Sequence, residues 1–173
     1  GAYTGAVHAR EGLFAAAHGG TLFLDEIGEL PTDQQALLLR VLETGRFRRV
    51  GGAREFSVEC RLVSATNRPL TAMVESGSFR QDLYHRIAGF TISLPPLRER
   101  IEDIPCLVDH FFESARRESG RKLRGIDPAA VAALQKKRWP GNVRELKMAV
   151  QRAIYMAQGD SLRIEDFELD HGT

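Results

Sequence analysis

The sequence predicts an α/β subdomain built around a parallel sheet, followed by a second subdomain made only of helices. Within residues 19–26, four apolar or β-favouring residues run unbroken and then stop at two adjacent carboxylates. Such a run is typical of a strand buried on both faces, as in a parallel sheet. Beyond Pro95 and Pro96, apolar residues recur at helical spacing almost to the end of the chain. We therefore expect an α/β subdomain over residues 1–97 and a helical subdomain over residues 98–173.

The first subdomain alternates helix and strand patterns after this strand. Leu37 with Val41, and Leu38 with Leu42, are spaced i,i+4 and predict one apolar helix face, with Gly45 as the helix stop. The other expected elements are a β-hairpin at residues 46–50 and 55–59, a strand at 61–67, a helix at 79–86 and a short strand at 91–94.

Capping signals place three helices in the second subdomain. Asp103 precedes a helix that Gly120 ends, and Asp127 is followed by a proline, which favours the first turn of a helix. Asn142 and Glu145 have the spacing of a capping box, so a third and longer helix is expected to begin there.

Composition sets limits on the function. The chain has 173 residues, 43% of them hydrophobic, which is a normal balance for a globular protein. Lys and Arg (24) nearly balance Asp and Glu (23), and the net charge of +1 is unlike the basic surface of a nucleic-acid-binding domain. We find no apolar run of membrane-spanning length and no signal peptide. Two distant cysteines indicate a cytoplasmic protein, and the missing initial Met leads us to expect a fragment.

The carboxylates at the end of the first strand are the leading candidates for chemistry. Open α/β sheets bind ligands at the carboxyl ends of their strands. Asp25 could hold Mg²⁺ there and Glu26 could polarise a water molecule, although a strand followed by an acidic turn fits the same pattern. Asn67 ends the next apolar strand, where it could orient water, contact a phosphate or form an Asx-turn before Pro69.

Three cations and one aromatic residue are further candidates. Arg80 and Arg86 lie about 240° apart around the expected helix. Each would serve a different contact, one of them across a subunit boundary, unless both are ordinary surface arginines. Arg144 lies in the first turn of its helix, where the dipole disfavours a cation, which indicates a functional reason. Tyr3 would be an exposed contact group for a partner or part of a disordered end.

Taken together, these segments resemble the central ATPase domain of the sigma-54-dependent transcriptional activators of the NtrC type, within the AAA+ superfamily. GGTLFLDEIGELP at 19–31 is similar to the family's Walker B segment, residues 65–67 to sensor I and WPGNVREL at 139–146 to sensor II. Arg80 and Arg86 match its paired arginine fingers. The family's GAFTGA loop is matched, with tyrosine in place of phenylalanine, by Gly1, Ala2, Tyr3, Thr4, Gly5 and Ala6.

The resemblance implies a P-loop-type ATPase subdomain with a helical lid, assembled as a hexameric or heptameric ring. Mg²⁺ and ATP would bind at subunit interfaces, with Asp25 on the metal, Glu26, Asn67 and both arginine fingers in catalysis, and Arg144 on the γ-phosphate. Hydrolysis would drive the loop of residues 1–6 against sigma-54, so that RNA polymerase opens the promoter. The family also implies a two-component system, DNA binding only through a separate domain, and no membrane partner.

The chain departs from this family in one respect. Its 173 residues contain no G-x-x-x-x-G-K-[ST] phosphate-binding loop, the Walker A motif, which in the family comes with two further strands. We therefore predict that this chain alone neither binds nor hydrolyses ATP appreciably, and that its α/β half is disturbed while its lid is well formed. A sigma-54-binding module without catalysis is the alternative function. A DNA-binding fragment is the weakest hypothesis, because four residues follow Leu169.

Overall fold

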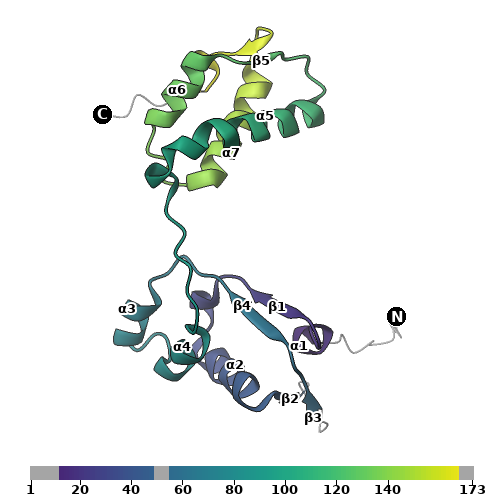
Figure 1. Ribbon diagram of the computed structural model, residues 1–173, viewed down its shortest axis with the longest axis vertical. Coiled ribbons are helices and arrows are strands. Elements are labelled where there is room, and N and C mark those ends of the chain that lie inside the picture. Colours follow the sequence, from purple (N-terminus) through teal and green to yellow (C-terminus); the bar gives the residue numbers. More distant parts are fainter. Residues whose placement is uncertain (1–11, 49–54, 168–173) are drawn as a thin grey trace, which may run out of the picture. The chain divides into compact units, whose positions relative to one another are not determined.

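The structure, a computed structural model, describes residues 12–48 and 55–167. It divides into two compact units, one ending at Ile92 and one beginning at Ser93 (Figure 1). The boundary expected after Leu97 differs from this division, because the side chain of Leu97 is fully buried in the core of the second unit. Within the described ranges, no helix has the length and apolar character needed to cross a bilayer.

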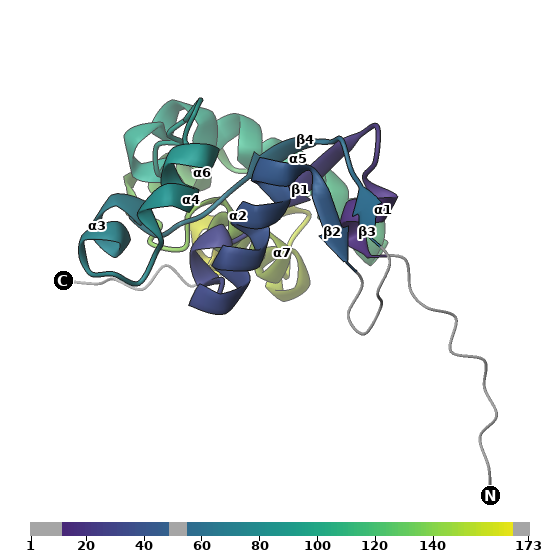
Figure 2. The ribbon, with the colours of Figure 1, turned by 90° about the horizontal axis from the view of Figure 1, so that it is seen from below.

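The first unit combines a small parallel sheet with helices. β1 and β4 pair in parallel, with Leu24 opposite Ser64, and β2 and β3 form the predicted antiparallel hairpin (Figure 2). Gly45 ends α2 in the left-handed conformation expected of a helix stop. The elements of this unit are α1 (Leu13–Ala16), β1 (Thr21–Leu24), η1 (Ile27–Glu29), α2 (Thr32–Thr44), β2 (Arg46–Arg48), β3 (Glu55–Ser57), β4 (Arg61–Ser64), α3 (Leu70–Glu75) and α4 (Gln81–Ile87).

The core of the first unit lies among its helices. α2 buries Gln35, Leu38 and Leu39, whereas Leu37 is 63% exposed, so the predicted inward position of Leu37 was wrong. The buried positions follow the i, i+3, i+4 spacing of one helix face, and Leu42 extends it. The buried members of this core are Ile27, Leu38, Leu39, Met73, Phe79 and Leu83.

The sheet is covered less completely than the sequence predicted. Leu22 of β1 is buried, but Phe23 is 57% exposed and Val63 of β4 is 38% exposed. The prediction that the first strand is buried on both faces was therefore wrong. Alternate residues of a strand point to opposite faces, so one face of this pair packs inward and the other is open.

The predicted strand at residues 91–94 is absent, and this prediction was also wrong. The segment has no regular secondary structure, and Ile92 and Leu94 are 71% and 80% exposed. No described strand lies beside it to supply hydrogen bonds, and a strand without a neighbour is not stable in water. Phe90, just before this segment, is exposed as well.

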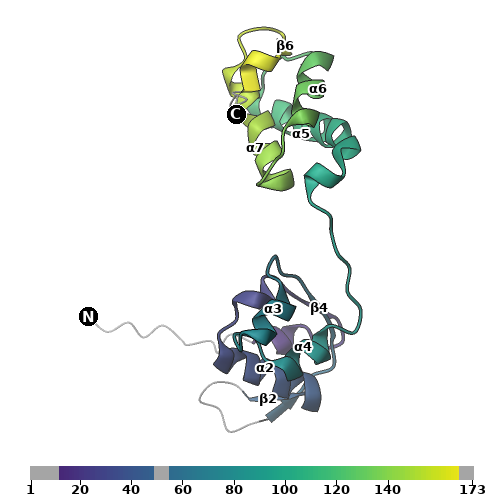
Figure 3. The same ribbon diagram turned by 90° about the vertical axis from the view of Figure 1, so that its left-hand side faces the viewer.

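The second unit is helical, as predicted. α5 packs against α7, and α6 and the final 3-10 turn, η4, complete this unit (Figure 3). Trp139 is fully buried in its core. The indole N–H of Trp139 donates to the carbonyl of Leu134 at 2.8 Å. The elements of this unit are η2 (Leu97–Glu99), η3 (Ile101–Asp103), α5 (Ile104–Ser119), β5 (Gly125–Ile126), α6 (Pro128–Lys136), α7 (Asn142–Met156), β6 (Ser161–Leu162) and η4 (Ile164–Phe167).

The caps of α6 and α7 differ in how well they were predicted. Asp127 caps α6 as expected, because its carboxylate accepts from the Ala129 N–H at 3.0 Å. The capping box at α7 was wrong in its pairing. The Glu145 carboxylate accepts from the Gly141 N–H at 2.8 Å, while the Asn142 side chain accepts from the Leu97 N–H at 2.8 Å. Asn142 thus joins two segments of the lid.

Candidate functional site

Asp25 and Glu26 follow β1 directly, and both are exposed. Glu26 has a left-handed backbone, with φ of 53° and ψ of 44°, and its N–H donates to the Asp25 carboxylate at 3.0 Å. A left-handed conformation is unfavourable for a residue with a side chain other than Asn or Asp, and such strain gathers at functional sites. The turn therefore presents two neighbouring carboxylates in a conformation that local propensity alone would not choose.

The parallel pairing brings the loop of Asn67 to the same edge as these carboxylates. The Ala65 N–H donates to the Leu24 carbonyl at 2.9 Å, and the Ile27 N–H donates to the Ala65 carbonyl at 3.0 Å. Both loops therefore leave the carboxyl ends of neighbouring strands side by side. Asn67 is exposed there. This edge is the place where open α/β sheets bind their ligands.

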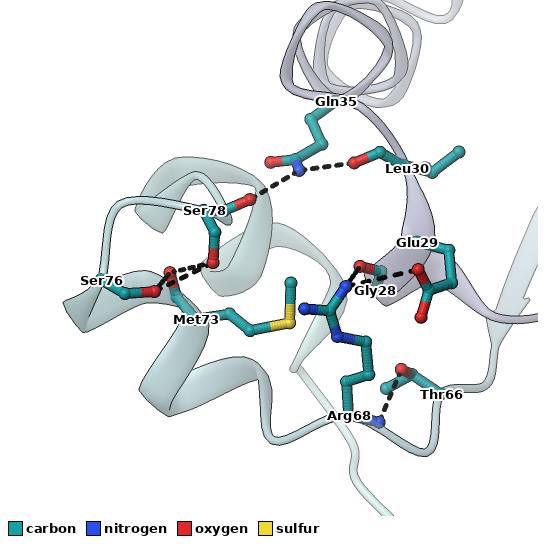
Figure 4. A network of polar contacts seen from close by, with 9 residues as sticks. All are labelled: Gly28, Glu29, Leu30, Gln35, Thr66, Arg68, Met73, Ser76 and Ser78. Atoms are coloured by element: carbon teal, nitrogen blue, oxygen red, sulfur yellow. Dashed lines mark hydrogen bonds and ion pairs between the residues drawn. The ribbon is translucent and has the colours of Figure 1, made fainter.

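Arg68 holds the two loops together by contacts with Gly28 and Glu29, which we call the clamp (Figure 4). The Arg68 guanidinium donates to the Gly28 carbonyl at 3.0 Å and pairs with the Glu29 carboxylate at 3.4 Å. The Thr66 hydroxyl accepts from the Arg68 N–H at 3.1 Å. A Cβ atom on Gly28 would lie 2.7 Å from the Thr66 hydroxyl oxygen, so glycine is what lets the loops approach.

Arg80 lies just before α4 in an extended conformation. The angle that we predicted between it and Arg86 assumed that both were helical, and that assumption was wrong for Arg80. Its guanidinium makes two hydrogen bonds to the Asp82 carboxylate, at 3.0 Å from Nε and 2.6 Å from Nη2. The hydrogen bond holds the pKa of Asp82 below its ordinary value and raises the pKa of Arg80.

Arg86 has a structural contact within its own unit. Its guanidinium donates to the carbonyl of Leu42 at 2.9 Å, in the last turn of α2. Carbonyl groups there have no partner inside the helix, and the negative end of the helix dipole favours a cation. Arg86 therefore caps α2, whereas the guanidinium of Arg80 binds the carboxylate of Asp82, two positions further on.

The other predicted site residues lie outside the described part of the first unit. Arg144 is exposed in the first turn of α7, in the second unit, and so belongs to a separately described part of the chain. The loop of residues 1–6 lies outside the described residues. In the described part, no three His, Cys, Asp or Glu side chains gather as a metal cage. The carboxylates of Asp25 and Glu26 fit Mg²⁺ instead in the way typical of nucleotide sites, where one or two carboxylates act with phosphate oxygens and water.

Two known families match the chain. The sigma-54 interaction domain family matches residues 1–93, more than half of the chain, and the AAA+ ATPase lid domain family matches residues 98–172. The chain belongs to the sigma-54-dependent activators. This result confirms the resemblance drawn from the motifs, and it confirms the fold class, an AAA+ α/β part followed by a helical lid.

Several sigma-54 activators are close relatives in sequence. The chain is 54% identical over 160 residues to the Nif-specific regulatory protein of Herbaspirillum seropedicae, covering 92% of this chain and 30% of that protein. It is 48% identical over 166 residues to the transcriptional regulator NtrC of Escherichia coli (strain K12), covering 96% of this chain and 35% of that protein. The chain thus spans about a third of the length of these curated relatives.

Solved structures agree with this assignment. NtrX from Brucella abortus in complex with ATP matches with a TM-score of 0.82 at 39% identity, covering 89% of this chain and 36% of that chain. The same protein in complex with ADP matches with a TM-score of 0.83 at 38% identity, covering 91% and 37%.

The sequence analysis did not identify four residues that support the candidate site residues of this sigma-54 activator chain. Gly28 and Arg68 form the clamp between loops, and no local pattern marks them. Asp82 binds the guanidinium of Arg80. Gln35 is fully buried, and its place on the apolar face of α2 was a signal that could have found it.

Proposed function

We propose that these residues form part of an ATPase that couples ATP hydrolysis to the remodelling of sigma-54 RNA polymerase, so that promoters open. The observation that supports this most is the edge where the two exposed carboxylates and Asn67 follow paired parallel strands. Family membership is consistent with it. Because the chain covers only a part of its relatives, the activity, partners and assembly of the whole protein remain within this proposal.

Each polar residue of this edge has a proposed role. Asp25 would hold Mg²⁺, whose charge neutralises the phosphate oxygens during phosphoryl transfer. Glu26 would orient and polarise the attacking water, since its exposed carboxylate lies beside the metal-binding position. Asn67, able to donate and to accept, would contact that water or a phosphate.

The cations would act from other surfaces. Arg80 would reach the nucleotide of a neighbouring subunit as an arginine finger, exchanging its bond to Asp82 for phosphate oxygens. Arg86 is proposed as the second finger, although its contact with the Leu42 carbonyl also gives it a structural task. Arg144 would reach the γ-phosphate from the lid.

The remaining proposals concern partners and assembly. Gly1, Ala2, Tyr3, Thr4, Gly5 and Ala6 would contact sigma-54. The subunits would form a hexameric or heptameric ring in the cytoplasm, under the control of a two-component system, and would contact DNA through a separate domain.

Catalysis is tested by phosphate release in the full-length product of the encoding gene. We expect Arg80→Ala to lower turnover by about a thousandfold or more, the order of magnitude for an arginine finger. Glu26→Ala should lower it by about 100- to 10,000-fold, as the loss of a group that activates water does. Gln34→Met is the control, because Gln34 is exposed in the first turn of α2 and has no proposed role in catalysis. Turnover kept in Glu26→Ala or in Arg80→Ala would refute the assignment.

The second candidate is a sigma-54-binding module without catalysis, favoured by the lack of a Walker A motif in these 173 residues. We propose that the 173 residues by themselves do not bind Mg·ATP appreciably, because backbone N–H groups at a P-loop normally hold the phosphates. Isothermal titration giving micromolar affinity would contradict this. Phosphate release by the full-length product separates the two candidates.

A further inference from the structure

Gln35 is an unusual residue in the core of the first unit. Among the described residues it is the one polar or charged side chain with no exposed surface. Burying an amide is unfavourable unless its donors and acceptor find partners. Here both are engaged. Nε2 donates to the Leu30 carbonyl at 2.8 Å and to the Ser78 carbonyl at 3.1 Å, and Oε1 accepts from the Arg80 N–H at 2.8 Å.

These three bonds join segments that are distant in the sequence. Leu30 lies between the carboxylate turn and α2, and Figure 4 shows Gln35 between Leu30 and Ser78. Ser78 and Arg80 lie just before α4. An apolar side chain of the same size would fill the same space without the need for partners. What the amide adds is a fixed backbone position for residues 78–80 relative to α2.

The same turn is also fixed from its other side. The carbonyl of Met73 accepts from the N–H groups of Ser78 and Phe79, at 2.9 and 3.0 Å, and also from the Ser78 hydroxyl at 3.1 Å. Phe79 is buried in the core. The backbone of Arg80 is therefore held on a rigid turn while its side chain is partly exposed.

We propose that Gln35 is a positioning residue for Arg80. It holds the Arg80 N–H so that the guanidinium leaves the turn at one fixed point and in one direction. This inference rests on the proposed function, in which Arg80 acts in the active site of a neighbouring subunit. Through Gln35 the segment that follows the carboxylate turn of one site and the finger that serves the next site share a single side chain.

The anchor itself is tested in the 173-residue chain by amide hydrogen exchange read by NMR. Gln35→Met keeps the length of the side chain but removes all three hydrogen bonds. We expect the Arg80 amide to exchange at least about tenfold faster, because an opened N–H loses its protection. Gln34→Met is the exposed neighbour and should leave this rate unchanged. Equal Arg80 exchange in the two variants would overturn the proposal.

General destabilisation needs its own control. Leu39→Ala removes buried volume from the same helix without touching the Arg80 hydrogen bond. It should raise exchange throughout the first unit, whereas Gln35→Met should raise it most at Arg80. If Gln35→Met does not fold, Gln35→Glu replaces it, with parent and variant both measured at acid pH. The neutral carboxyl group can there accept from the Arg80 N–H and donate to one of the two carbonyls, whereas a charged carboxylate would face both carbonyl oxygens. Arg80 exchange must then stay near that of the parent chain, and loss of its protection would count against the anchor.

The catalytic consequence is tested in the full-length product by a double-mutant cycle. We expect Gln35→Met to lower kcat by about 10- to 100-fold, as small misplacements of a catalytic group do, with KM for ATP within about twofold. In an Arg80→Ala background Gln35→Met should lower kcat no further, because it acts only through Arg80. Losses that multiply would overturn the proposal. Full turnover in Arg80→Ala would instead refute the proposed function, while the exchange experiment would still judge the anchor.

Discussion

At the scale of single residues, the left-handed backbone of Glu26 lowers the stability of the fold while it presents a carboxylate at the candidate site. Its φ of 53° suits glycine better than any residue with a Cβ atom. The residue keeps this conformation although it is exposed. A strained residue with a carboxylate is expected where the site needs the charge of that carboxylate.

This gives a matched pair of substitutions. We expect Glu26→Gly to be more stable than Glu26→Ala by about 1 kcal/mol, because alanine keeps the left-handed strain and glycine does not. Thermal unfolding followed by far-UV circular dichroism measures the difference. Both variants should lack turnover in the full-length product. An alanine variant as stable as the glycine variant would show that the turn is not strained as described.

Gly28 allows a second prediction at this scale. Gly28→Ala places a Cβ atom 2.7 Å from the Thr66 hydroxyl oxygen, which should cost about 1–3 kcal/mol of unfolding free energy. Gly89→Ala is the control, since nothing lies within 4 Å of its added Cβ. Urea unfolding compares them. Adding Thr66→Ala to Gly28→Ala should recover part of the loss, and an unchanged loss would contradict the clamp.

At the scale of elements, α2 connects more of the site than its pattern suggested. Its buried face holds Gln35, which binds the Arg80 backbone, and its last turn accepts from Arg86. The helix and its glycine stop were predictable from apolar spacing. The contacts were not, because a side chain's partner 45 positions away is set by tertiary packing rather than by local propensity.

The beginning of α7 shows the same limit. The spacing of Asn142 and Glu145 correctly placed a helix start, but the asparagine side chain serves Leu97 instead of its own helix. Asn142 also has a positive φ of 51°, which asparagine tolerates better than most residues. Local sequence showed that a cap was needed and could not show which groups supply it.

Substitutions at Asn142 follow from this geometry. We expect Asn142→Ala to destabilise the lid by about 1–3 kcal/mol, since it loses an acceptor and gains backbone strain. Asn142→Gly should be less harmful, because it loses the hydrogen bonds of the side chain without the added backbone strain. The single tryptophan, Trp139, is buried in the lid core, so its fluorescence during urea unfolding reports this unit. A glycine variant less stable than the alanine variant would contradict the backbone argument.

At the scale of the whole molecule, the two units differ in the size of their buried apolar cores, and the larger core is in the second unit. The second unit surrounds Trp139, Leu146 and Ile154 completely. In the first, a sheet of two strands leaves Phe23 and Val63 open to solvent. This division followed from the change in hydrophobic period along the sequence. The missing strand at residues 91–94 did not, because pairing depends on a neighbour that no local pattern shows.

Unequal burial predicts unequal protection. We expect amides of α5 and α7 to exchange more slowly than those of β1 and β4, because local opening is easiest where few apolar contacts must break. Hydrogen exchange followed by mass spectrometry on the 173-residue chain measures both. Equal protection in the two units would refute the expectation that the α/β half is disturbed.

The exposed segment at residues 90–94 has a practical consequence. It is uncharged, rich in β-favouring residues and 71–85% exposed at Phe90, Ile92 and Leu94, the composition of segments that stack into cross-β aggregates. Pro95 and Pro96 follow directly and have no amide hydrogen to continue such a ladder, so they act as gatekeepers. Turbidity in concentrated stocks of this chain would then arise from five residues that are exposed in the native state, and dilution would not clear it, because cross-β stacks are very stable once formed.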